Sequence, residues 1–200
     1  MPRPARPPAP ESNARKPRFA KRSYTFSGII RDIAIAFRAI LSLSNMNPNE
    51  ASQGLTPQFR EHVMLAVTAV NKCRYCSWVH SRLALQAGCS TADIEAFLGS
   101  DFSNAGKDEL VALAFAQHYA EARGKPDLAA ARKLLLTYGR ERASAIMACI
   151  QTITIGNLTG NTLDAFRARL RGVHVEGGSL LLEFIVFLIG KPLTRVLKMG

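Results

Sequence analysis

The amino-acid sequence predicts an all-α protein, a bundle of short helices joined by short loops. Apolar residues recur at helical spacing through most of the chain. Capping residues and glycines separate these segments where helices should begin and end. No two segments form a convincing strand pair, because the β-branched run at 153–155 is too short to outweigh its helical flanks. Short helices with short connections are typical of a bundle.

The first half of the chain carries clear start and stop signals. Ser27 is a suitable N-cap for an amphipathic helix, and Pro57 fits the first turn of the next helix. Gly88 is a natural left-handed C-cap. Ser90 and Asp93 form a capping box. These signals predict helices over about residues 27–44, 58–70, 73–88 and 90–98.

The second half continues the pattern. Apolar spacing predicts a helix over 107–123 that closes at Gly124, and a further helix over 127–138 that Gly139 stops. A strongly apolar helix follows over about 140–155. The last apolar run, 179–190, is interrupted only by Glu183 and is too short for a membrane span. We therefore expect a buried or subunit-facing helix there.

The positive charge is concentrated at the two ends. The formal net charge is +11, with seven basic residues against one acidic residue in 1–24 and six against two in 166–200. Six of the ten prolines lie in residues 1–17. Such a segment buries too little apolar surface to order itself. We expect a disordered basic tail at 1–24, a near-neutral helical catalytic domain at 25–165, and an apolar C-terminal segment at 166–200 that packs or forms a subunit interface.

The four cysteines do not make a disulfide framework in a chain of 200 residues. The N-terminal residues lack the apolar segment of a secretory signal. We therefore expect a cytoplasmic protein. In that compartment a C-x-x-C pair points to redox chemistry or to metal binding.

The candidate site lies between Glu61 and Gly88. Cys73, Cys76 and His80 are spaced so that one helix would display all three on one face. Glu61 lies twelve residues before Cys73 and reaches that face only through the fold.

These residue types suit thiol redox chemistry. A thiolate is favoured by a nearby base, by positive charge or by a helix N-terminus. We expect all three around Cys76, with His80 as the base and Lys72, Arg74 and Arg82 as the cations. Glu61 is the candidate carboxylate that orients His80. Cys73 is placed to resolve an oxidised Cys76 as a disulfide.

Structural zinc is the competing interpretation. Cys73, Cys76, His80 and Cys89 are four potential ligands. A regular helix over 73–88 would place Cys89 about 24 Å from Cys73 at about 1.5 Å per residue. We therefore expect no metal, and the other histidines and cysteines are interpreted as structural or solvated.

The order Glu61, Cys73, Tyr75, Cys76, His80 resembles the motif of the carboxymuconolactone decarboxylase family, specifically its alkylhydroperoxidase-like branch. The resemblance covers about residues 50–165, most specifically up to Gly88. Some peroxidase members have a second histidine where this chain has Tyr75. The basic tail and the apolar C-terminal helix lie outside the resemblance.

The resemblance implies an all-α, alkylhydroperoxidase-like bundle that assembles as a homo-oligomer, commonly a trimer or hexamer. It also implies a hydroperoxide reductase in which Cys76 attacks peroxide, His80 and Glu61 relay protons, and Cys73 resolves the intermediate. No cofactor is implied beyond an external dithiol reductant such as a lipoyl protein. The decarboxylase branch lacks the cysteine pair, which argues against lactone decarboxylation here.

The alternative is an oligomeric binding protein of the same fold, whose C-x-x-C senses redox state. In that interpretation the basic ends bind nucleic acid, or the apolar helices meet a membrane surface or a partner. We favour neither contact, because a basic tail is more often a solvated extension.

Overall fold

The computed structural model describes residues 18–45 and 55–196, and its described part is all-α, as the sequence predicts. The helices are α1 (Ile29–Asn45), α2 (Pro57–Asn71), α3 (Arg74–Gln86), α4 (Thr91–Leu98), α5 (Leu110–Glu121), α6 (Leu128–Leu170) and α7 (Leu180–Val196). Two short strands, β1 (Arg18–Phe19) and β2 (His174–Val175), complete the described elements.

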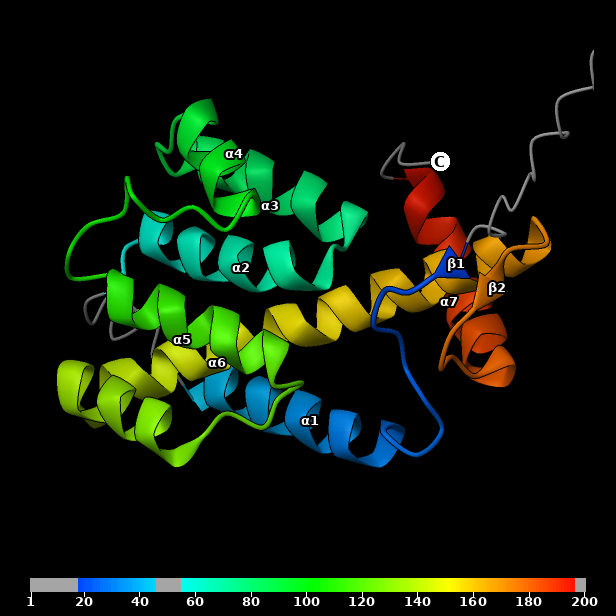
Figure 1. Ribbon diagram of the computed structural model, residues 1–200, viewed down its shortest axis with the longest axis horizontal. Helices are drawn as coiled ribbons and strands as arrows, with labels where there is room; N and C mark the ends of the chain where they lie inside the picture. The colour runs from blue at the N-terminus through cyan, green and yellow to red at the C-terminus, as the bar shows by residue number, and fades with distance from the viewer. Residues whose placement is uncertain (1–17, 46–54, 197–200) are drawn as a thin grey trace, which may run out of the picture.

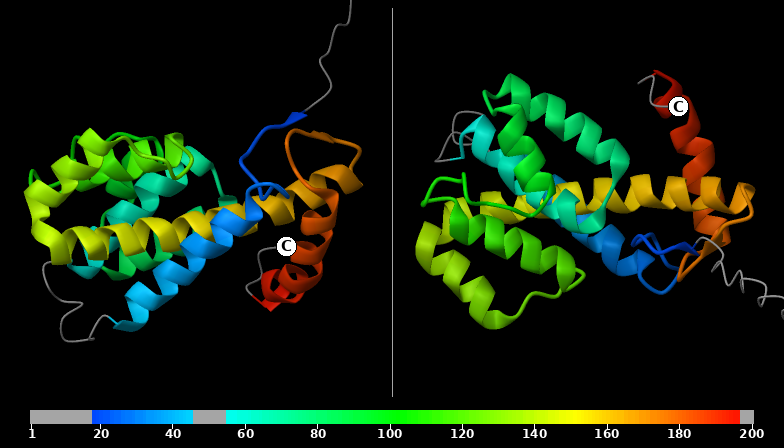
Figure 2. Two further views of the ribbon diagram at one scale, coloured as in Figure 1. Left: turned by 90° about the horizontal axis from the view of Figure 1, so that it is seen from below. Right: turned by 45° about the horizontal axis from the view of Figure 1, so that its top comes forward.

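Helix α6 is the long central helix, which runs along the length of the molecule (Figure 1). It contacts α1, α2, α3 and α5 along its length and α7 near its C-terminal end. Figure 2 shows α1 running beside it and α7 folding back onto its far end. The main hydrophobic core lies between α2, α5 and α6, and a smaller one lies under α4. The site described below is therefore framed by α2, α3, α6 and α7.

The chain bends at Gly139 within α6. Its φ of 71° and ψ of 172° interrupt the helix, which confirms the stop expected there. The helix after the bend does not end near Ile155, where apolar spacing predicted its end. It continues to Leu170, through the expected domain boundary at 165.

Buried polar side chains explain why apolar spacing underestimated α6. Asn157 and Asn161 have no exposed surface. Asn161 Nδ2 donates to the backbone oxygens of Asn71 and Arg22, at 2.8 and 3.0 Å. Thr68 donates to Asn157 Oδ1 at 3.3 Å. Tertiary partners bind Asn157 Oδ1 and Asn161 Nδ2, so the helix buries a polar face that hydropathy cannot recognise.

The end of the expected tail packs against the body, which corrects the prediction for residues 18–24. Tyr24 is buried, and its backbone N–H donates to Thr162 Oγ1 at 2.9 Å. Strand β1 pairs in parallel with β2, with Arg18 opposite His174. The expectation of no strand pair is therefore wrong for these few residues. Residues 1–17 lie outside the described residues.

Helix α7 is tied to α6 by a buried ion pair. Glu183, the one charge in the apolar run, has no exposed surface and accepts hydrogen bonds from Arg169 at 2.6 and 3.2 Å. Phe166 packs against Phe184 and Phe187 beside this pair. Among the described residues, no helix is long and apolar enough to cross a bilayer.

Candidate active site

The two cysteines of the C-x-x-C pair lie side by side at the start of α3. Their sulfur atoms are 2.9 Å apart, and both thiols are free. Cys73 is the N-cap of α3 and is not part of the helix, so the expectation that one helix displays Cys73, Cys76 and His80 on one face is wrong for Cys73. Its sulfur accepts a hydrogen bond from the backbone N–H of Cys76 at 3.3 Å. The cap therefore holds the Cys73 sulfur over the first turn of α3.

The two thiols differ in acidity and in access. The hydrogen bond between the sulfurs lowers the pKa of Cys73 and raises that of Cys76, and burial raises the pKa of Cys76 further. This is opposite to the expectation that Cys76 is the readily ionised thiol. Cys73 has no exposed surface, whereas Cys76 is partly exposed. The acidic sulfur is therefore the enclosed one, and Cys76 is the sulfur that a substrate can reach.

The expected cations do not surround Cys76. Arg74 pairs with Asp164 at 2.8 Å, and the guanidinium of Arg82 stacks 3.9 Å from the Trp78 ring centre. Lys72 lines a different pocket. Positive charge is thus directed away from Cys76, which is consistent with the raised pKa of its thiol.

Glu61 and His80 meet, as the sequence suggested. His80 Nδ1 and Glu61 Oε2 are 2.7 Å apart, and both side chains are largely buried. Helix α2 supplies Glu61 and α3 supplies His80, so the packing of these two helices makes the contact. A carboxylate on one ring nitrogen fixes the orientation of the imidazole and leaves Nε2 for another partner.

Cys76 and His80 open onto one apolar cavity of about 410 Å³. Its other lining side chains come from α2, α3, α6 and α7 and include Met64, Ile153, Leu163 and Val186. Helix α7, which the sequence suggested as a packing or interface element, therefore forms part of the site wall. A cavity of this size and lining suits a small apolar molecule.

A polar network beside the cavity was not predicted. Tyr75, between the two cysteines, donates its hydroxyl hydrogen to Asp164 Oδ1 at 2.8 Å. Arg74 and Arg167 both donate to the Tyr75 hydroxyl oxygen. Lys21 pairs with Asp164 at 3.6 Å. The network fixes the cysteine turn to the end of α6. A tyrosine between two cysteines was its only signal in the sequence.

A second set of reactive side chains lies outside the cavity. His62 Nδ1 is 2.6 Å from Glu109 Oε2, and His62 Nε2 is 3.3 Å from Cys89 Sγ. His62 and Cys89 are both buried, and burial raises the pKa of the Cys89 thiol. Cys89 thus lies against His62 and not beside the C-x-x-C pair. The interpretation of His62 and Cys89 as buried structural residues fits this placement.

Gly160 makes room for the cysteine turn. A Cβ atom there would lie 2.6 Å from Cys73 Sγ and 3.1 Å from Tyr75 Cδ2. We expect Gly160→Ala to lower the free energy of unfolding by about 1–2 kcal/mol, because overpacking outweighs the helix propensity gained. Chemical denaturation measures this change.

Gly156, one turn earlier, is the matched control for that substitution. Its added Cβ would meet Cys76 Sγ at 3.7 Å, an ordinary contact. Gly156→Ala should keep the stability or raise it by up to about 1 kcal/mol. Equal stability of the two variants would contradict the close approach of α6 to Cys73.

Comparison with protein families identifies the segment that holds these residues. Residues 42–118 match the family described as Carboxymuconolactone decarboxylase family. The match includes Glu61, Cys73, Cys76 and His80 but ends before α6 and α7, so it is shorter than the resemblance noted in the sequence. Comparison with curated proteins and with solved structures found no match. Over residues 42–118, which hold the candidate site residues, the chain is therefore similar to the carboxymuconolactone decarboxylase family.

Proposed function

We propose that the protein is a thiol-dependent hydroperoxide reductase. The observation that carries the proposal is the placement of Cys76. Its sulfur lies 2.9 Å from a second thiol and opens onto the cavity that His80 also lines. Glu61 orients His80 from α2. A nucleophile, a resolving thiol and an oriented base are the groups that two-step peroxide reduction requires.

In the first step Cys76 Sγ attacks the terminal oxygen of a hydroperoxide and the O–O bond breaks. His80 accepts the thiol proton and returns it to the departing alkoxide, which leaves as the alcohol. Cys76 is then a sulfenic acid. His80 is the suitable base because it lies one turn along α3 and Glu61 stabilises its protonated form.

In the second step the sulfur of Cys73 attacks the sulfur of Cys76 and the S–O bond breaks. The hydroxyl group leaves as water with the proton of Cys73. The sulfurs must approach from 2.9 Å to the disulfide length of about 2.05 Å. The lowered pKa of Cys73 favours its attacking form. An external dithiol, such as a lipoyl protein, then reduces the disulfide and becomes oxidised itself.

Mass spectrometry of the peroxide-treated protein tests the proposal. One equivalent of an alkyl hydroperoxide should convert Cys73 and Cys76 to a disulfide. The mass of the protein should fall by two hydrogens, and two thiols should no longer react with an alkylating reagent. Cys89 and Cys149 are buried away from the cavity and should stay free. Free thiols at Cys73 and Cys76, under conditions that oxidise a known thiol peroxidase, would overturn it.

The apolar cavity should select the organic part of the substrate. Val186 on α7 lines the cavity, and phenylalanine there would narrow it. We expect Val186→Phe to slow reduction of cumene hydroperoxide about tenfold while changing hydrogen peroxide reduction far less. Leu188→Phe, at an exposed position on the same helix, is the control. Equal losses with both substrates would show that α7 does not shape specificity.

We also propose a homo-oligomer, a trimer or a hexamer. Helix α1 exposes Ile30, Ile33 and Phe37, and α7 exposes Leu181 and Ile189. Apolar residues gathered on helix faces are typical of subunit contacts. Light scattering of the purified protein measures the assembly.

A further inference from the structure

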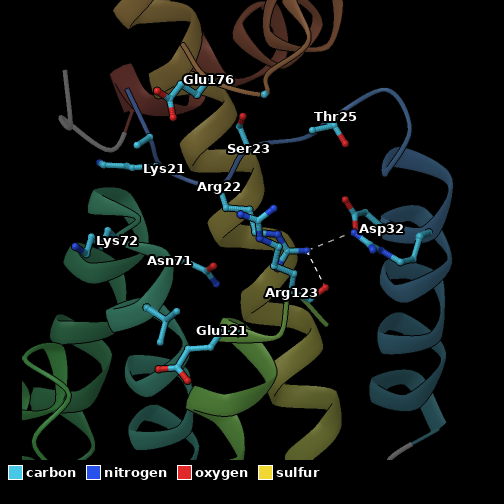
Figure 3. Close-up of a pocket in the computed structure, with 15 residues that line it drawn as sticks. Lys21, Arg22, Ser23, Thr25, Asp32, Asn71, Lys72, Glu121, Arg123 and Glu176 are labelled. Atoms are coloured by element: carbon cyan, nitrogen blue, oxygen red, sulfur yellow. Dashed lines mark hydrogen bonds and ion pairs between the residues drawn. The ribbon is translucent and has the colours of Figure 1, made fainter. Parts of the chain in front are cut away.

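A second pocket, of about 600 Å³, shares no lining residue with the cavity at Cys76 (Figure 3). The segment before α1 forms one wall, the end of α2 a second and the end of α5 a third. Arg22 lies at its centre, and Asn71 points toward it from α2. Unlike the apolar cavity, this pocket is lined mainly by charged and polar side chains.

The lining carries an excess of positive charge. Lys21 and Glu176 carry opposite charges and cancel in the balance of the lining, and each also pairs with a residue outside it, Asp164 and Arg18 respectively. Of the remaining charges, Asp32 is shared by two arginines, Arg22 at 4.0 Å and Arg31 at 3.4 Å. One carboxylate cannot neutralise two guanidinium groups.

Two further cations and one acid complete the count of charges that line the pocket. Lys72 and Arg123 are exposed and carry no ion pair among the described residues, and Glu121 is exposed at the lower rim. Four cations thus face two carboxylates, so the pocket has two positive charges in excess. A dianion would balance them.

Two buried donors in the pocket have no hydrogen-bond partner. Asn71 is 5% exposed, and its Nδ2 is unpartnered among the described residues. Arg22 Nη1 is also buried and unpartnered, while its Nη2 donates to the backbone oxygen of Arg123 at 3.4 Å. Leaving such groups unsatisfied is costly, above all for a charged one. Both need acceptors, and both border the same pocket.

We propose that this pocket binds the phosphate group of a small phosphorylated molecule. Phosphate oxygens accept from Arg22 Nη1 and Asn71 Nδ2, and its dianionic charge matches the excess of two. The volume is within the range of small-molecule sites, so the pocket has room for an organic portion beyond the phosphate. The site is separate from the cavity at Cys76, and the proposal does not depend on peroxide chemistry.

Titration calorimetry of the full chain at constant ionic strength tests the proposal, with inorganic phosphate and glycerol 2-phosphate as probes and acetate as the monoanionic comparison. We expect saturable binding of both phosphate probes and about tenfold weaker binding of acetate. Tighter binding of glycerol 2-phosphate than of inorganic phosphate would identify a phosphate ester as the ligand. The reverse order would identify free phosphate.

Two exposed cations allow a mutational test that leaves the buried contacts of Arg22 intact. Lys72→Gln and Arg123→Gln should each weaken phosphate binding several-fold, and together about tenfold or more. Lys133→Gln, at an exposed position on α6 outside the pocket, should leave it unchanged. Absence of saturable phosphate binding, acetate binding as tight as phosphate, or equal affinity in the double variant and the Lys133 control would overturn the proposal. Each outcome is measured without peroxide, so failure here leaves the proposed reductase untouched.

Discussion

Replacing Cys76 with serine is expected to reduce hydroperoxide turnover at least about a thousandfold. Cys76 is the thiol that opens onto the cavity, whereas Cys73 has no exposed surface. A serine hydroxyl cannot form a sulfenic acid. With Cys76 replaced, the cavity lining has no thiol left to attack the hydroperoxide. Coupled assays with a dithiol reductant measure the loss.

Cys73→Ser should give a different result. Cys76 can still attack the hydroperoxide, but its sulfenic acid has no resolving thiol and should accumulate. Dimedone should then trap the sulfenic acid as an adduct that mass spectrometry detects. Cys89→Ser is the matched control, because Cys89, like Cys73, is a buried free thiol, but it lies against His62 and not beside Cys76. Turnover retained in Cys76→Ser, or dimedone labelling of Cys73 in its place, would reverse the assignment of the two cysteines.

The second large effect is expected for Glu61→Gln. This change removes the charge that stabilises protonated His80 but keeps the shape of the side chain. We expect the rate of sulfenic acid formation to fall about a hundredfold, the lower end of what general acid–base catalysis contributes. Stopped-flow measurement with excess hydroperoxide isolates that step from reduction of the disulfide.

The structure provides a close control for Glu61 in Glu109. Both carboxylates bind Nδ1 of a largely buried histidine, at 2.7 Å for Glu61 with His80 and 2.6 Å for Glu109 with His62. Glu109→Gln should therefore lower stability about as much as Glu61→Gln does, but it should leave the rate unchanged. Equal rate losses in both variants would show that Glu61 acts only on stability and has no place in the proton relay.

Local signals in the sequence predicted much of the fold. The proline of α2, the capping serine of α4 and the glycines at positions 88, 124 and 139 mark turns that the structure contains. They succeed because capping and left-handed conformations depend on a few neighbouring residues. The end of α6 was missed for the opposite reason, since its buried asparagines form hydrogen bonds with chain segments distant in sequence.

The sequence by itself determined which reactive groups the site contains. Glu61, Cys73, Cys76 and His80 were recognisable from their types and spacing, and the family match includes them. Only the tertiary structure decided how they lie relative to one another. The contact of Glu61 with His80 requires α2 to pack against α3, and the cavity wall at Val186 requires α7 to fold back onto α6. It also decided which thiol is enclosed. Spacing along a helix defines neighbours on one element, whereas burial, pKa and access depend on the other elements packed against it.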